Sequence, residues 1–187
     1  MRLRVPLSLA AVGLLAVPLF SSVSRTGEGA QVGQMIPKFS AQTFGFLDSS
    51  ANPVTTCYLF VGVKCGATPG YVKRMKALED EFRPKGVQFV YAFPNKTETM
   101  DEKLGWHEEQ GFHGAMLEDE SAKIAKSLGI DHTAAAVIVD KSGKILYSGG
   151  IDDNRSEGAV QRRHVAEALN EHLAGKAVSV TTSKAFG

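Results

Sequence analysis

The chain has almost no excess of charge of either sign. Its 21 Lys and Arg residues offset 20 Asp and Glu residues, which gives a formal net charge of +1. No basic stripe interleaved with aromatic residues occurs either, so the sequence offers no electrostatic argument for a nucleic-acid partner. Its 187 residues are 43% hydrophobic, which is enough for one ordinary globular domain with a packed core.

Cysteine is also scarce, since only Cys57 and Cys65 occur. Cys57 opens an apolar run, residues 57–63, that is rich in β-branched and aromatic side chains and predicts a buried strand. If extended backbone continues to Cys65, it separates the two residues by about 26 Å, whereas a disulfide spans about 5.5 Å. We therefore expect two free thiols, with Cys57 buried in the strand.

The N-terminus carries the features of an export signal. A short basic segment, residues 1–4, precedes a continuous apolar stretch over residues 5–20, and Ser22 and Ser24 offer a small-x-small cleavage site. The apolar stretch is short for a membrane span, which needs about 20 residues. We predict a signal peptide over residues 1–24, with a retained N-terminal membrane anchor as the alternative, and a flexible lead-in over residues 25–34. The mature protein would then be periplasmic or secreted.

Cys65 is the strongest candidate for chemistry. It lies between the predicted strand and a pattern of helical spacing that includes Val72, so we expect its thiol at a helix N-terminus, where free N–H groups stabilise a thiolate. Lys64 would add positive potential, and Thr68 could donate a hydrogen bond to the sulfur. The alternative is that Cys65 is a small apolar residue at the end of a strand.

The remaining patterns predict an α/β domain over residues 35–176, followed by a tail over residues 177–187. The expected order after an irregular N-terminal arm or hairpin is β-α-β-α-α-β-β-α, and the late pair of strands forms a hairpin. Alternation in the first half implies parallel strands joined by a right-handed crossover. A mixed central sheet with helices on both faces satisfies this order. The predicted elements are strands 57–63, 87–93, 134–140 and 144–147 and helices 72–82, 97–110, 121–128 and 160–173.

This order, with a cysteine at the first strand–helix junction, resembles the thioredoxin fold. Within that fold the chain resembles the redoxin branch, which comprises the alkyl hydroperoxide reductase/thiol-specific antioxidant superfamily and its TlpA-like relatives. The resemblance implies an antioxidant or disulfide-exchanging thiol oxidoreductase that needs no cofactor and takes electrons from a partner thiol or disulfide protein. It covers residues 32–176 and is carried by segments 33–39, 60–65, 86–90, 128–129, 137–140 and 147–153, by Tyr71, Arg74, Leu78 and Gly143, and by the tail segment 182–187.

The chain departs from the motifs of these families at three places. Thr68 stands where Cys-x-x-Cys oxidoreductases have their second cysteine, so no resolving thiol is present in that motif. Tyr58 and Gly62 stand where the peroxiredoxin signature has proline and threonine. Ala134, after Thr133, stands where the family has a proline that is usually cis. The sequence therefore predicts a single-thiol mechanism through Cys65, in which a partner thiol resolves the intermediate.

A second resemblance points to copper. Asp131, His132 and Thr133 precede an apolar strand, as in Sco-type copper chaperones, where a histidine and two cysteines bind the metal. Here Cys65 and His132 match two of those ligands, but Pro69 replaces the second cysteine. Thiolate and imidazole suit copper, although two ligands predict modest affinity. A third alternative is a redoxin fold that has lost its chemistry and serves as a binding module.

Overall fold

The computed structural model describes residues 30–37, 43–44, 54–119 and 121–187. The predicted signal peptide, and all of the predicted lead-in before residue 30, lie outside these ranges. Within them, none of the helices combines the length and the apolar composition that crossing a membrane requires.

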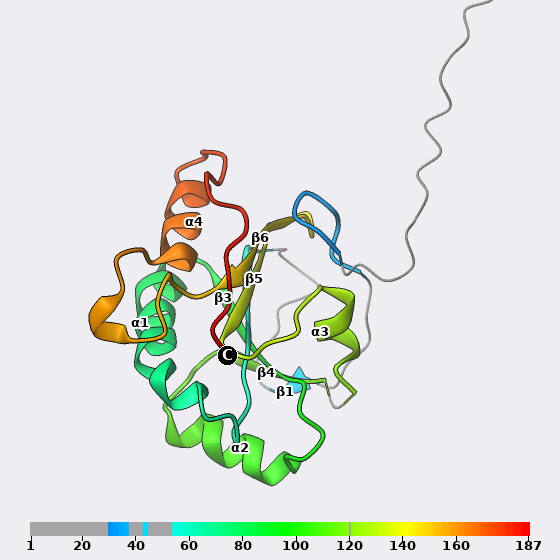
Figure 1. Ribbon diagram of the computed structural model, residues 1–187. Coiled ribbons are helices and arrows are strands. Elements are labelled where there is room, and N and C mark those ends of the chain that lie inside the picture. The colour runs from blue at the N-terminus through cyan, green and yellow to red at the C-terminus, as the bar shows by residue number, and fades with distance from the viewer. Residues whose placement is uncertain (1–29, 38–42, 45–53, 120) are drawn as a thin grey trace, which may run out of the picture.

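A six-stranded mixed sheet forms the centre of the molecule (Figure 1), with the strand order β1-β4-β3-β2-β5-β6. β2 is parallel to β3, and β3 is parallel to β4. β5 is antiparallel to both β2 and β6, and β1 is antiparallel to β4 at the edge. This confirms the predicted mixed sheet and its late hairpin. The strands are β1 (Thr43–Phe44), β2 (Thr56–Phe60), β3 (Gln88–Phe93), β4 (Ala115–Glu118), β5 (Ala135–Val139) and β6 (Ile145–Gly150).

Helices cover both faces of the sheet, as predicted. Figure 1 shows α1 (Val72–Phe82) and α4 (His164–Leu173) on one side and α3 (Lys123–Ser127) on the other. The first face also receives Trp106 from α2 (Met100–Glu109). Because side chains alternate along a strand, successive residues of β2 enter different cores: Cys57 and Leu59 join the α1–α4 core, and Phe60 joins the α3 core.

The predicted strand 57–63 is too long at its end. β2 runs only from Thr56 to Phe60, and the chain turns beyond it, so Cys57 and Cys65 do not lie along one strand. Both cysteines are nevertheless free thiols, as predicted. Cys57 is buried in the centre of the sheet, whereas Cys65 is partly exposed in a loop.

The sequence patterns missed β4, which lies between the two middle helices. Its four residues are too few to give a clear alternation. Gly114, immediately before β4, explains part of the packing, because a Cβ at this position would lie 2.7 Å from the Phe89 carbonyl oxygen of the neighbouring strand.

Two helix starts also differ from the prediction. α2 begins after Thr99, whose hydroxyl accepts the Glu102 N–H while the Glu102 side chain accepts the Thr99 N–H, so the cap lies two residues after the predicted start at Thr97. α4 begins at His164 rather than at the predicted Val160. Val160 instead caps the end of the short 3₁₀ turn η3 (Glu157–Ala159).

Candidate functional site

Cys65 lies in the turn between β2 and α1. Its N–H donates to the Gly62 carbonyl at 3.2 Å, and its own carbonyl accepts from Thr68 N–H at 3.2 Å. A single 3₁₀ turn, η1 (Thr68–Gly70), then leads into α1. The predicted position of the Cys65 thiol at the N-terminus of the helix is therefore off by one turn, because η1 lies between Cys65 and α1.

A side-chain hydroxyl and a backbone N–H form hydrogen bonds with the Cys65 sulfur. Thr133 Oγ1 lies 2.9 Å from Sγ, and the Ala67 N–H donates to Sγ at 3.4 Å. Partial burial acts to raise the pKa of the Cys65 thiol, but the hydrogen bonds from Thr133, Ala67 and Thr68 outweigh it and hold this pKa below its ordinary value. The site therefore favours the thiolate by direct hydrogen bonds.

Cys57 has the opposite environment. Its strand lies between β3 and β5, and its side chain is completely buried in the α1–α4 core. Burial raises the pKa of the Cys57 thiol well above its ordinary value. The two cysteines thus differ in both access and ionisation, and only Cys65 combines a favoured thiolate with partial exposure.

Thr68 and Gly62 support the turn around Cys65. The Thr68 side chain is buried, and its hydroxyl accepts the Gly62 N–H at 3.4 Å. A Cβ at Gly62 would displace Asn95 Nδ2, which is hydrogen-bonded to Glu98, and would lie 3.2 Å from Cys65 Cβ. This packing gives a physical reason for glycine where the peroxiredoxin signature has threonine. Thr68 also contributes to lowering the pKa of Cys65 through its N–H and its hydroxyl.

The loop before β5 faces Cys65, but the residue that meets the sulfur is Thr133 and not His132, the predicted copper ligand. Ala134, at the position of the family proline, has a left-handed backbone with φ 54°, which the proline ring forbids. Its N–H, which a proline would lack, donates to the Phe60 carbonyl at 2.8 Å. That bond ties the loop to the end of β2 and holds Thr133 over the thiol.

His132, the predicted second copper ligand, is half-exposed and pairs through Nδ1 with the Asp131 carboxylate. Among the residues that the structure describes, no group of three or more His, Cys, Asp or Glu side chains is arranged to hold a metal ion. Copper binding by Cys65 and His132 stays a prediction, which a copper titration of the reduced protein and of His132→Ala would test.

Lys64 does not direct its charge at the sulfur in the way the sequence predicted. Its ammonium binds Glu102 Oε1 at 2.8 Å and the Thr97 carbonyl at 3.0 Å. This pairing links the loop that carries Cys65 to the start of α2, and the Glu102 carboxylate neutralises the positive charge of Lys64.

The sequence analysis missed Glu98. Its carboxyl group is buried, and Oε1 accepts the Lys64 N–H at 2.9 Å and Asn95 Nδ2 at 2.8 Å. Glu98 therefore fixes the backbone of the residue before Cys65. In the sequence it lies in a polar stretch next to a helix start, where an acidic residue is normally read as a helix cap.

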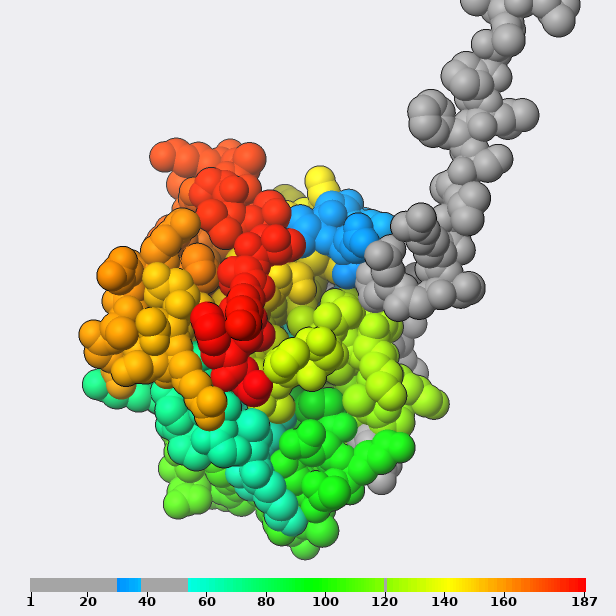
Figure 2. Space-filling model, in the orientation of Figure 1, coloured from blue at the N-terminus to red at the C-terminus, as the bar shows by residue number. Residues whose placement is uncertain are grey.

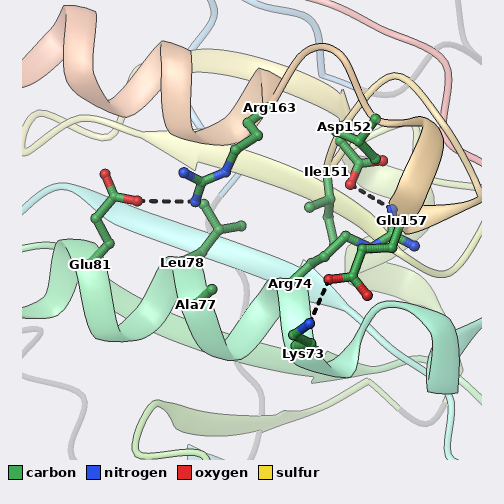
Figure 3. Close-up of a pocket in the computed structure, with 10 residues that line it drawn as sticks. Lys73, Arg74, Ala77, Leu78, Glu81, Ile151, Asp152, Glu157 and Arg163 are labelled. Carbon is green, nitrogen blue, oxygen red and sulfur yellow. Dashed lines mark hydrogen bonds and ion pairs between the residues drawn. The ribbon is translucent and has the colours of Figure 1, made fainter.

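A cavity of about 400 Å³ lies between α1 and the segment after β6 (Figure 3). Three ion pairs line it, and they join Lys73 to Glu157, Arg74 to Asp152 and Arg163 to Glu81. Its cationic side chains thus already have carboxylate partners across the cavity, and the pairs hold the segment after β6 against α1.

Replacing Thr133 with valine tests its role at the thiol. The variant keeps the shape of the side chain but removes the hydroxyl, so the pKa of Cys65 should rise and the pH midpoint of its alkylation should move upward. At neutral pH we expect the alkylation rate to fall about fivefold, the equivalent of one hydrogen bond of about 1 kcal/mol. The exposed Thr97 provides the control, because Thr97→Val should leave the profile unchanged. An unshifted profile for Thr133→Val would exclude this role.

Comparisons with solved structures place the fold. An uncharacterised conserved protein from Geobacillus kaustophilus is 22% identical, with a TM-score of 0.71 over 82% of this chain and 87% of that one. AhpC from Mycobacterium tuberculosis is 14% identical, with a TM-score of 0.56 over 81% and 98% of the two chains. The thioredoxin domain of a thiol-disulfide oxidoreductase from Bacteroides vulgatus is 16% identical, with a TM-score of 0.51 over 64% and 89%. These similarities confirm the predicted thioredoxin-like fold.

Sequence comparison places the family. No curated protein matches the chain significantly. The AhpC/TSA family profile, however, matches residues 32–148, a range that runs from the N-terminal arm through the Cys65 turn to β6. That range includes both the turn that carries Cys65 and the loop that carries Thr133. This match confirms the resemblance on which the redoxin interpretation was based: the chain belongs to the AhpC/TSA family.

Proposed function

We propose that this protein is a thiol oxidoreductase that reacts through Cys65 alone, with a disulfide, sulfenate or peroxide as its substrate. The observation that carries the proposal is the set of donors on the Cys65 sulfur, from Thr133 and Ala67. These donors lower the pKa of a partly exposed thiol, and the thiolate is the form that reacts. Membership of the AhpC/TSA family supports the same chemistry.

With a disulfide, the Cys65 thiolate attacks one sulfur, a new S–S bond forms, and the second sulfur leaves as a thiolate that takes up a proton. With a hydroperoxide, the thiolate attacks the terminal oxygen, the O–O bond breaks, and Cys65 becomes a sulfenic acid, while the leaving alkoxide takes up a proton from water to give the alcohol. In both cases Cys65 is oxidised and the substrate is reduced.

A partner thiol completes the cycle in this proposal. Thr68 replaces the resolving cysteine of Cys-x-x-Cys proteins, and Cys57 is buried in the centre of the sheet. An external thiol therefore attacks the mixed disulfide and releases reduced Cys65, or, after reaction with a peroxide, two external thiols reduce the sulfenic acid in turn. A partner protein that carries thiols is the expected electron donor.

We also propose that the protein works outside the cytoplasm. The support is the N-terminal sequence, in which a basic segment, an apolar stretch and small residues follow one another as in a signal peptide. N-terminal sequencing of the protein purified from its native host tests this: a mature start near residue 25 is expected, and an intact Met1 would favour a retained anchor.

Intact-mass measurement after reaction with a cysteine-containing peptide disulfide tests the single-thiol mechanism. We expect one peptide adduct per chain on Cys65, which persists until an external thiol is added and which Cys57→Ser leaves unchanged. Loss of two hydrogens without an adduct would reveal a Cys57–Cys65 disulfide and contradict the mechanism. No reaction at all would favour the binding module without chemistry.

A further inference from the structure

The C-terminal segment of residues 181–187, here called the strap, lies along β6 and adds to its edge. Ser148 N–H donates to the Thr181 carbonyl at 3.0 Å, and Ser148 forms a parallel bridge with Thr182. The Ser183 hydroxyl lies 2.6 Å from Tyr147 Oη and accepts the Gly150 N–H at 3.1 Å. Figure 2 shows the red strap between the orange segment that follows β6 and the yellow-green segment that leads into β5.

Two adjacent glycines make room for the strap. A Cβ on Gly149 would lie 2.6 Å from Ser183 N, and a Cβ on Gly150 would overlap the Lys184 carbonyl. Glycine inside a strand weakens it and marks a place where another backbone approaches closely. The end of β6 is therefore shaped to receive main chain rather than side chains.

The strap ends at the thiol site. The backbone of Gly187 packs directly on the backbone of Thr133, so closely that a Cβ on Gly187 would overlap the Thr133 carbonyl. The hydroxyl of the same Thr133 contacts the Cys65 sulfur at 2.9 Å. Ser148, Gly149, Gly150 and Thr133 together form what we call the strap-binding surface, which leads from the edge of β6 to Cys65.

The strap makes contacts that another extended segment can form in its place. Phe186 and Ala185 are only partly buried, each against a different core of the domain. A cavity of about 290 Å³ remains beside the strap, between Lys184 and the Asp131–His132 side of the loop before β5. The bond from Ser148 N–H to the Thr181 carbonyl joins two main chains and does not depend on the sequence of the bound segment, whereas the bonds of the Ser183 hydroxyl are specific to the strap.

We propose that the strap-binding surface is a site for an extended polypeptide segment, that the strap is its resident occupant, and that a protein partner of Cys65 must displace the strap. An extended segment bound there by strand addition runs toward Thr133 and brings its own disulfide next to Cys65. The identity of the bound segment as a redox partner rests on the function proposed above. The tethered strap competes at an effective concentration of about millimolar, so weakly bound segments are excluded.

Two variants with opposite consequences test the proposal. Ser183→Ala combined with Phe186→Ala loosens the strap but keeps the strap-binding surface intact. Gly149→Ala also releases the strap, but its new methyl group closes the surface to any other main chain. Gly158→Ala is the matched control, because a Cβ there has no atom within 4 Å. Cleavage by trypsin after Lys184 should become faster in both strap variants and not in the control.

The binding probe is a fluorescent peptide with the sequence of residues 179–187, followed by anisotropy with the full-length proteins. It should bind the Ser183→Ala/Phe186→Ala protein about tenfold more tightly than the wild type, because the competing strap no longer holds the surface. Gly149→Ala should bind it no better than the wild type. Equal binding by wild type and loosened variant, tight binding by Gly149→Ala, or unchanged trypsin cleavage would each overturn the proposal.

The peptide contains no cysteine, so its binding does not depend on redox chemistry. If Cys65 fails to react with any disulfide while the peptide binds as expected, the proposed function is wrong and the polypeptide site stands. If Cys65 reacts but the peptide distinguishes none of the variants, the polypeptide site is wrong and the thiol chemistry stands.

Discussion

Brief alkylation of the native, reduced protein is expected to label Cys65 and to leave Cys57 unmodified. Cys65 is partly exposed and its pKa is lowered by the hydrogen bonds of its sulfur, whereas Cys57 is completely buried with a raised pKa. Cys57 must wait for an opening of the sheet, so its rate should be at least about a hundredfold lower. Peptide mapping by mass spectrometry after a short exposure to iodoacetamide measures both rates.

The alkylation rate of Cys65 is also expected to change with pH in a definite direction. Because the thiolate is the reactive form and the pKa of Cys65 is lowered, its alkylation should rise with pH and reach its plateau at a lower pH than that of cysteine in an unfolded peptide. The urea-unfolded protein is the internal control, since both cysteines should then react alike. Faster labelling of Cys57 in the native protein would reverse the assignment of the reactive thiol.

Arg74→Ala is expected to destabilise the fold strongly. The guanidinium lies 2.6 Å from Asp152 Oδ2, and the two side chains are only 10% and 2% exposed. It also donates to the carbonyls of Asn154 and Arg155, which anchors the segment after β6. Removing one partner of a buried ion pair leaves the other charge uncompensated, at a cost of about 3–5 kcal/mol in the free energy of unfolding.

Lys73 provides the matched control for Arg74. It pairs with Glu157 at 3.1 Å across the same cavity, but the two side chains are 83% and 50% exposed. An exposed pair contributes about 0–1 kcal/mol, so Lys73→Ala should change the urea midpoint little. Equal effects of the two substitutions would contradict the role assigned to the Arg74–Asp152 pair.

The sequence predicted those parts of the fold that depend on local patterns. The apolar runs around Cys57 and over residues 87–93 contain the strands β2 and β3, most of whose residues are buried. The helical spacing through Met75, Leu78 and Phe82 became the core-facing side of α1. Such periodicity reflects which side of an element is buried. β4 was not predicted, because its four residues give too short an alternation of apolar and polar side chains.

The site was predictable only in part, because its contacts join residues that are far apart in the chain. Cys65 could be singled out from its own surroundings, but Thr133 reaches it from a loop 68 positions later. Lys64 looked like a local source of positive charge until the fold brought Glu102 beside it. The role of Ser183 and its neighbours likewise depends on the glycines of β6, which in the sequence look like an ordinary turn signal.

Turnover measured on single-cysteine variants tests the central claim most directly. With an external thiol as reductant and a peptide disulfide or an organic hydroperoxide as substrate, Cys57→Ser should keep a rate close to that of the wild type. Cys65→Ser should fall to the rate of the buffer control, because no second accessible thiolate is available among the described residues. Substantial turnover by Cys65→Ser, or its loss in Cys57→Ser with the fold intact, would contradict the assignment of Cys65 as the reacting thiol.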